Sequence, residues 1–80
     1  MAAQEIVSPL PGTFFRRPAP DKPVYKEVGD QVSPGEVIGL VEVMKTFYEV
    51  KSDATGRIGK FLVENEGPVQ AGQALVVLDV

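Results

Sequence analysis

The residues of this sequence most suited to chemistry are Lys45 and its neighbour Met44, in the middle of the segment VEVMKTFYEV, residues 41–50. Apolar and polar residues alternate on both sides of the pair, which indicates two half-buried strands joined by a tight turn. The turn lacks Asn-Gly or Asp-Gly, the pairs that most easily form a two-residue hairpin loop. Departures from local rules are more frequent at functional sites, so Lys45 is a candidate functional residue rather than an ordinary solvated turn charge.

Cysteine and histidine are both absent from the 80 residues. Without them the chain has no disulfide, no thiolate ligand for a soft metal and no Ser-His or Cys-His nucleophile pair. We therefore expect no metal site and no catalysis by the chain alone.

The charge balance argues against a nucleic-acid partner. The net charge is −3, whereas binding to phosphate needs clustered Lys and Arg, and Arg16-Arg17 is the one adjacent basic pair. No segment approaches the roughly 20 apolar residues that span a bilayer, and no leader pattern opens the chain. A cytoplasmic protein with no membrane partner is the expectation.

The elements that position Lys45 are predicted to be short strands. Apolar runs rich in β-branched residues are separated by Pro-Gly, Ala-Gly, Glu-Gly and Gly-Asp, and no window sustains a helical period. The predicted strands lie near residues 4–8, 12–16, 24–28, 37–43, 47–51, 57–63 and 74–80.

An internal repeat relates the two halves of the chain. A shift of 37 places residues 32–38, VSPGEVI, on residues 69–75, VQAGQAL, and a shift of 44 places residues 8–14 on residues 52–58. The difference between the shifts puts about seven extra residues in the first half, where the Pro-rich segment RRPAPDKP stands at residues 16–23.

Two such halves cannot each bury an apolar face alone, so they are expected to pack on one another. The simplest arrangement is a flattened barrel or sandwich of two small sheets related by a pseudo-two-fold axis. Both shifts map Lys45 onto the chain ends. Lys45 should therefore lie at the opposite end of the domain from the termini.

Five motifs together resemble the biotinyl domains of the biotin carboxyl carrier family, within the biotinyl-lipoyl attachment domains. They are VEVMK at residues 41–45, S-P-x-x-G-T-F at residues 8–14, V-G-D-x-V-x-x-G at residues 28–35, Gly56, and V-x-x-G-Q-x-L at residues 69–75. The resemblance covers nearly the whole chain. It implies a single all-β domain over residues 1–80, a barrel-sandwich hybrid of two quasi-symmetric four-stranded sheets.

The same resemblance implies a function. In that family a biotin-protein ligase joins biotin to the lysine as an amide, which makes Lys45 the acceptor, with Glu42, Val43, Met44 and Thr46 as residues recognised by the ligase or partner enzymes. The domain is then a carrier without catalytic residues, and its biotin moves carboxyl groups from a biotin carboxylase to a carboxyltransferase. The resemblance implies a carrier of an acyl-CoA carboxylase similar to acetyl-CoA carboxylase, either as a free subunit or as a fragment of a larger protein.

The Pro-rich segment is similar to the protruding thumb of bacterial acetyl-CoA carboxylase carriers, which can fold over the biotin ring. This resemblance implies that Arg17, Pro18, Ala19 and Pro20 contact biotin. Arg17 stands where those carriers have a small hydroxyl residue, and Thr46 stands where they have methionine. The thumb contact is therefore a hypothesis in which a guanidinium donates to the ureido oxygen.

Two alternatives stay open. A lipoyl carrier of an oxo-acid dehydrogenase or glycine cleavage system shares the fold and the lysine hairpin, but such domains usually show Asp-Lys-Ala at the tip and lack a thumb. An unmodified structural barrel of the same fold, as in efflux adaptors, carries a long helical insertion between its halves. The tip of this chain is Met44-Lys45-Thr46 and a Pro-rich insert is present, which differs from the lipoyl pattern. Only a few residues after Val50 separate the two halves, which differs from the efflux adaptors.

Overall fold

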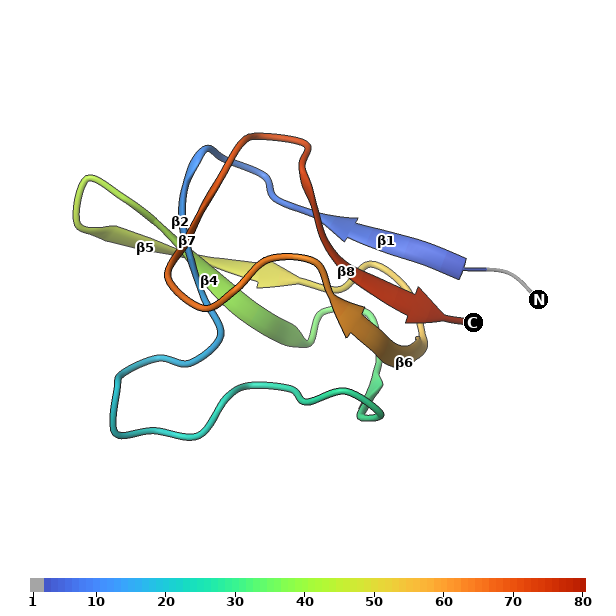
Figure 1. Ribbon diagram of the computed structural model, residues 1–80. Helices are drawn as coiled ribbons and strands as arrows, with labels where there is room; N and C mark the ends of the chain where they lie inside the picture. Colours follow the sequence, from blue (N-terminus) through green and yellow to red (C-terminus); the bar gives the residue numbers. More distant parts are fainter. Residues whose placement is uncertain (1–2) are drawn as a thin grey trace.

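The computed structural model describes residues 3–80, and within this range the regular secondary structure consists of strands (Figure 1). The strands are β1 (Ala3–Val7), β2 (Gly12–Phe15), β3 (Gln31–Val32), β4 (Val37–Val43), β5 (Thr46–Lys51), β6 (Gly56–Phe61), β7 (Gly67–Val69) and β8 (Ala74–Asp79). No helix long and apolar enough to cross a membrane occurs among the described residues.

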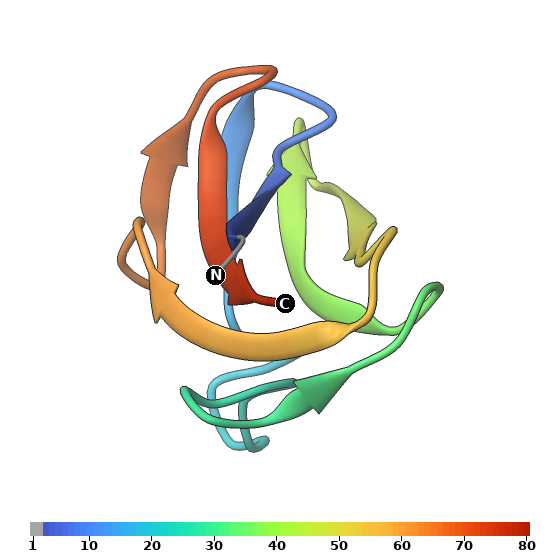
Figure 2. The same ribbon diagram turned by 90° about the vertical axis from the view of Figure 1, so that its right-hand side faces the viewer.

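The strands form two four-stranded antiparallel sheets that face each other (Figure 2). One has the order β1-β8-β6-β3 and the other the order β5-β4-β2-β7. The two orders are equivalent when β1, β2, β3 and β4 are matched with β5, β6, β7 and β8. The sheets are not closed into a barrel by pairing within residues 3–80. The predicted flattened barrel-sandwich of two quasi-symmetric sheets is therefore confirmed.

Hydrogen bonds between the halves reproduce the internal repeat. The Gly72 amide donates to the Ser8 carbonyl at 2.8 Å, and the Gly35 amide donates to the Ser52 carbonyl at the same distance. Both serines are buried. In each half, the carbonyl of a buried serine thus accepts a hydrogen bond from the glycine turn of the other half. Neither half is therefore a complete unit.

The four glycines of the repeat have two different roles. Gly35 and Gly72 adopt positive φ angles of 91° and 81°, which non-glycine residues rarely take. At Gly12 a Cβ would collide with the backbone of Glu42, while at Gly56 it would lie 2.8 Å from the Asp79 carbonyl oxygen. Gly35 and Gly72 are thus required by the backbone conformation, whereas close strand packing excludes a side chain at Gly12 and Gly56.

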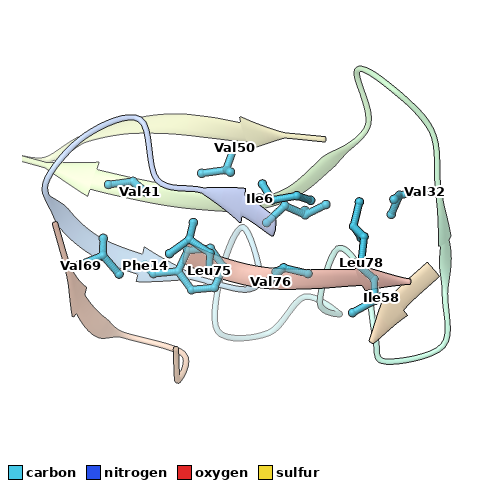
Figure 3. Packing of buried hydrophobic residues seen from close by; sticks show 11 residues of the cluster. Ile6, Phe14, Val32, Val41, Val50, Ile58, Val69, Leu75, Val76 and Leu78 are labelled. Atoms are coloured by element: carbon cyan, nitrogen blue, oxygen red, sulfur yellow. The ribbon is translucent and has the colours of Figure 1, made fainter. Parts of the chain in front are cut away.

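Every strand contributes to one hydrophobic core between the sheets (Figure 3). Apolar side chains of the strands point inward, as with Phe14 of β2 and Val41 of β4, and β4 and β8 also bury consecutive residues. The cluster comprises Ile6, Phe14, Val32, Ile38, Val41, Val50, Ile58, Val69, Leu75, Val76 and Leu78. This continuous core fixes the β4–β5 hairpin to the rest of the molecule.

The strand predicted at residues 24–28 is wrong. This segment belongs to the loop between β2 and β3, where the Tyr25 amide donates to the Arg16 carbonyl and the Arg16 and Lys26 side chains make further contacts. The prediction also missed β3 and β7, since β3 has two residues and β7 contains Pro68. Proline is compatible with β7 because this strand lies at the edge of its sheet.

The β4–β5 hairpin and the chain ends lie at opposite ends of the molecule, as predicted from the repeat (Figure 1). The loop over residues 16–30 leaves β2 and turns at the same end as the hairpin tip before it returns to β3. The fold therefore presents the tip and this loop together, far from the termini.

Candidate functional site

The tip of the β4–β5 hairpin consists of Met44 and Lys45, with Val43 paired to Thr46 directly below. Met44 has a φ angle of 50° and Lys45 a φ angle of 68°. Positive φ at both central residues is the mark of a type I′ turn, whose twist matches that of the flanking strands. Left-handed backbone costs a non-glycine residue roughly 1–2 kcal/mol. The expected conflict between local chemistry and this turn is therefore confirmed.

Both residues of the turn project into solvent. Met44 is 93% exposed, and Lys45 is exposed beside it. Among the predicted recognition residues, Thr46 is also exposed, Glu42 is half-buried, and Val43 packs against the core. A rigid two-stranded support thus presents one primary amine and one thioether at its apex.

The predicted biotin-contact residues line a pocket of about 150 Å³ between the 16–30 loop and the body of the domain. Arg17, Pro18, Ala19 and Pro20 form the wall on the loop side. The facing wall is aromatic, because Phe15 and Phe47 meet edge to face with ring centroids 5.8 Å apart. The structure thus brings these four residues to the same side of the molecule as β5, which begins immediately after Lys45.

Residues distant in sequence complete this pocket. Asn65 and Glu66, from the turn between β6 and β7, lie on its edge. Glu66 has a positive φ of 66°, and its amide donates to the Phe14 carbonyl at 2.6 Å. Neither residue, nor Phe47, was predicted from the sequence as part of the site. The exposed Phe-Tyr pair directly after the lysine was the signal for Phe47, whereas no local pattern placed the turn around Glu66 beside the pocket.

The pocket is suited to a small ring with a polar edge. Its walls are proline and phenylalanine, and Arg17 supplies a guanidinium whose Nη1 makes a long 3.4 Å hydrogen bond to the Lys22 carbonyl. Apolar walls with one or two placed polar groups are typical of small-molecule sites. Together with the exposed Lys45 amine, these residues fit a cofactor that is attached at the tip and folds back onto the loop.

A second hollow, of about 730 Å³, lies where β5 faces the end of β1. It is lined by Val7, Pro9 and residues 47–51, and its charged groups are Glu49 and Lys51, which form an exposed ion pair at 3.7 Å. Surface pairs of this kind contribute little. The larger hollow is a shallow seam between two edge strands, so we assign the candidate site to the smaller pocket. Within residues 3–80, no group of three acidic or His/Cys ligands could hold a metal.

The end of the loop that leads to β3 is anchored by Lys26. Its ammonium donates to the Gln31 carbonyl at 3.1 Å and to Glu36 Oε2 at 3.2 Å. Glu36 Oε1 accepts the Ser33 amide at 2.7 Å. The bond from the Ser33 amide, followed by the Lys26 contact, lowers the pKa of Glu36 below its ordinary value of 4.5.

This lowered pKa predicts an acid-sensitive contribution to stability. Because the folded pKa is below the unfolded value, the contribution is complete above pH 4.5 and is lost as pH falls through the folded pKa. Glu36→Gln should flatten this part of the stability profile and keep the turn, since Gln73 Oε1 already accepts the Gln70 amide at 2.9 Å in the equivalent turn. Urea unfolding of both proteins from neutral pH to well below pH 4.5 measures the effect. Parallel profiles would contradict it.

Comparison with known proteins finds one family over most of the chain. The model of the family described as "Biotin-requiring enzyme" matches residues 4–78. The biotin carboxyl carrier protein of acetyl-CoA carboxylase from Nostoc sp. is 40% identical over 72 residues, which are 90% of this chain and 40% of that protein. The protein of the same name from Chlamydia trachomatis is 46% identical over 88% of this chain and 43% of its own length. The chain spans less than half the length of these relatives.

Solved structures agree with the fold. The Kluyveromyces lactis urea carboxylase matches with a TM-score of 0.79 and 29% identity, over 99% of this chain and 6% of that protein. A single-chain, multi-domain long-chain acyl-CoA carboxylase matches with a TM-score of 0.73 at 23% identity, over 94% of this chain and 7% of its own, and supports the fold alone. A small unit with this architecture therefore occurs inside much larger proteins.

Proposed function

The chain belongs to the family of biotin-requiring enzymes, and from this premise we propose that Lys45 is the residue to which biotin is covalently attached. The observation that supports the proposal is the exposed amine at the apex of a tight hairpin, at the far end of the molecule from the termini. A ligase must reach both the amine and the backbone that carries it, and a type I′ turn offers both in a fixed geometry. On acylation Lys45 Nζ loses its charge and its stem lengthens the arm.

We further propose that residues 1–80 form one biotinyl domain that acts as a carboxyl carrier in an acyl-CoA carboxylase of the acetyl-CoA carboxylase type. Bound biotin would supply the nitrogen that holds the carboxyl group. The chain itself holds the biotin, presents it to the partner enzymes and supplies no catalytic residue. Its partners are then a biotin-protein ligase, a biotin carboxylase and a carboxyltransferase, in the cytoplasm, with no nucleic acid or membrane involved.

The residues around Lys45 differ in exposure and therefore in how a partner protein can contact them. Met44, with its exposed thioether, is the side chain that a partner surface can contact directly. Glu42 and Thr46 flank the turn on the two strands, and Val43 fixes the turn to the core. We assign recognition by the ligase and the partner enzymes to these four residues as a unit.

The carrier role is tested by reconstitution. Domain first biotinylated by a biotin-protein ligase is incubated with a biotin carboxylase, ATP and labelled bicarbonate, and the label on the protein is counted after rapid filtration. Acid-labile label on the biotinylated domain, at a stoichiometry close to one, is expected. Biotinylated protein that accepts no label would reject the carrier role while leaving the attachment site intact.

Residues 16–23 are proposed to act as a thumb, with Arg17 and the segment 18–20 covering the biotin ring. The ring would lie between this wall and Phe47, with the Arg17 guanidinium donating to the ureido oxygen, an acceptor that favours charge-assisted hydrogen bonds.

Arg17→Ala is expected to raise the exchange rate of the biotin ureido N–H protons severalfold, because the pocket loses its charged donor. NMR of the biotinylated domain measures this rate. Lys22→Ala is the matched control, since Lys22 lies exposed on the same loop and its loss removes the same charge. Equal rates in wild type and Arg17→Ala would reject the contact.

A further inference from the structure

Arg16 lies at the base of the 16–30 loop, where β2 ends, and contacts both ends of that loop. Its backbone amide donates to Asn65 Oδ1 at 2.8 Å, and its carbonyl accepts the Tyr25 amide at 2.9 Å. Its Nη2 donates to the Lys26 carbonyl at 3.3 Å. Its guanidinium carbon lies 4.0 Å above the centre of the Phe61 ring. Through its backbone and its side chain, Arg16 thus joins the outgoing end of the loop, the returning end and the body of the domain.

The Phe61 contact crosses between the sheets. Phe61 is the last residue of β6, whereas the loop leaves from β2 in the other sheet. Arg16 is half-buried, and its Nε is buried without a hydrogen-bond partner beside the ring. Cation–π attraction is stronger for desolvated groups, and arginine combines it with in-plane hydrogen bonds in a way that lysine cannot. Partial burial therefore distinguishes Arg16 from a fully solvated loop charge.

The middle of the loop has few ties of its own. The Lys22 amide donates to the Ala19 carbonyl at 3.0 Å, which forms a turn, and Arg17 Nη1 makes the long contact to the Lys22 carbonyl. Both bonds lie within the loop and leave its position relative to the sheets undetermined. That position depends on the two ends, which Arg16 brings together.

We infer that Arg16 is a positioning residue, which holds the segment 17–24 opposite Phe47 through the Phe61 stack and the Lys26 carbonyl and so sets the shape of the pocket. The inference about the loop stands on these contacts alone. Its consequence for biotin rests on the proposed function. A loop held at its base can cover a ring at the tip without first being ordered, which lowers the entropic cost of covering it.

Hydrogen exchange on the unmodified domain tests the inference. In Arg16→Met and in Phe61→Leu, the Tyr25 amide should exchange about tenfold faster, because one cation–π contact or the hydrogen bond that accompanies it is lost. Phe61→Tyr keeps an aromatic face and should retain the wild-type rate. The amide of Val41, in the central strand β4, serves as the internal reference for global opening.

The outcomes are distinct. Wild-type exchange at Tyr25 in Arg16→Met would overturn the inference, and so would equal acceleration at Tyr25 and Val41, which would mean a general loss of stability. Equal rates in Phe61→Leu and Phe61→Tyr would overturn the role of the ring. If Tyr25 alone accelerates, but the ureido protons of the biotinylated Arg16→Met variant keep their wild-type rate, the positioning role stands and the thumb contact with biotin fails.

Discussion

Lys45→Arg is expected to abolish attachment of biotin and to leave the fold unchanged. A guanidinium keeps the positive charge but is a far weaker nucleophile than a free amine, since it stays protonated at any accessible pH. Lys45 is exposed at the tip, so the substitution removes no buried contact. After coexpression with a biotin-protein ligase, an avidin gel-shift assay should detect the wild type and give no signal for the variant.

Lys51→Arg provides the matched control for this experiment. Lys51 is the last residue of β5, on the same hairpin, and its side chain is about half exposed. The same substitution there should leave the avidin shift at the wild-type level. Retained biotin in Lys45→Arg, or loss of it in Lys51→Arg, would mean that the acceptor is another amine.

Phe14→Ala is expected to have the largest effect on stability. Phe14 is fully buried in β2, and its ring fills the space that the missing side chain of Gly39 leaves open, since a Cβ at Gly39 would lie 2.6 Å from it. Truncation of a buried phenylalanine costs about 3–5 kcal/mol. The whole free energy of unfolding of 80 residues is roughly 4–12 kcal/mol. The substitution should therefore remove from about a quarter to all of the free energy of unfolding, as urea titration followed by circular dichroism would measure.

Phe47→Ala is the control for Phe14→Ala, because it removes the same type of side chain from an exposed position. Phe47 is 53% exposed, and its main contact is the edge-to-face pair with Phe15. Loss of such a pair costs about 0.5–1.5 kcal/mol. A comparable loss of stability in Phe14→Ala and Phe47→Ala would contradict the packing described for the core.

The lysine hairpin could be predicted from the sequence because two independent patterns coincide there. Alternation on both sides of Met44-Lys45 marks the strands, and the repeat places the turn opposite the chain ends. The short edge strands could not be predicted in this way. Gln31–Val32 is too short to show a period, and in Gly67–Val69 the Gly-Pro pair indicates a turn unless the edge position is known.

Only the loop side of the candidate site could be predicted from the sequence. The Pro-rich segment at residues 16–23 predicts a stiff projection, but no local sequence pattern indicates which surface of the domain it faces. The facing residues Asn65 and Glu66 reach the pocket through the pairing of β2 with β7, a long-range contact. The role of Arg16 depends equally on Phe61, whose position above the loop follows from the stacking of the two sheets.

The most direct test of the central claim is the intact mass of the wild-type domain, expressed in cells that supply both biotin and lipoate together with their ligases, followed by fragmentation of the modified peptide. We expect a mass increase equal to one biotin amide, located on Lys45. A lipoyl adduct, a biotin on another lysine, or an unmodified protein in the presence of active biotin-protein ligase would contradict it.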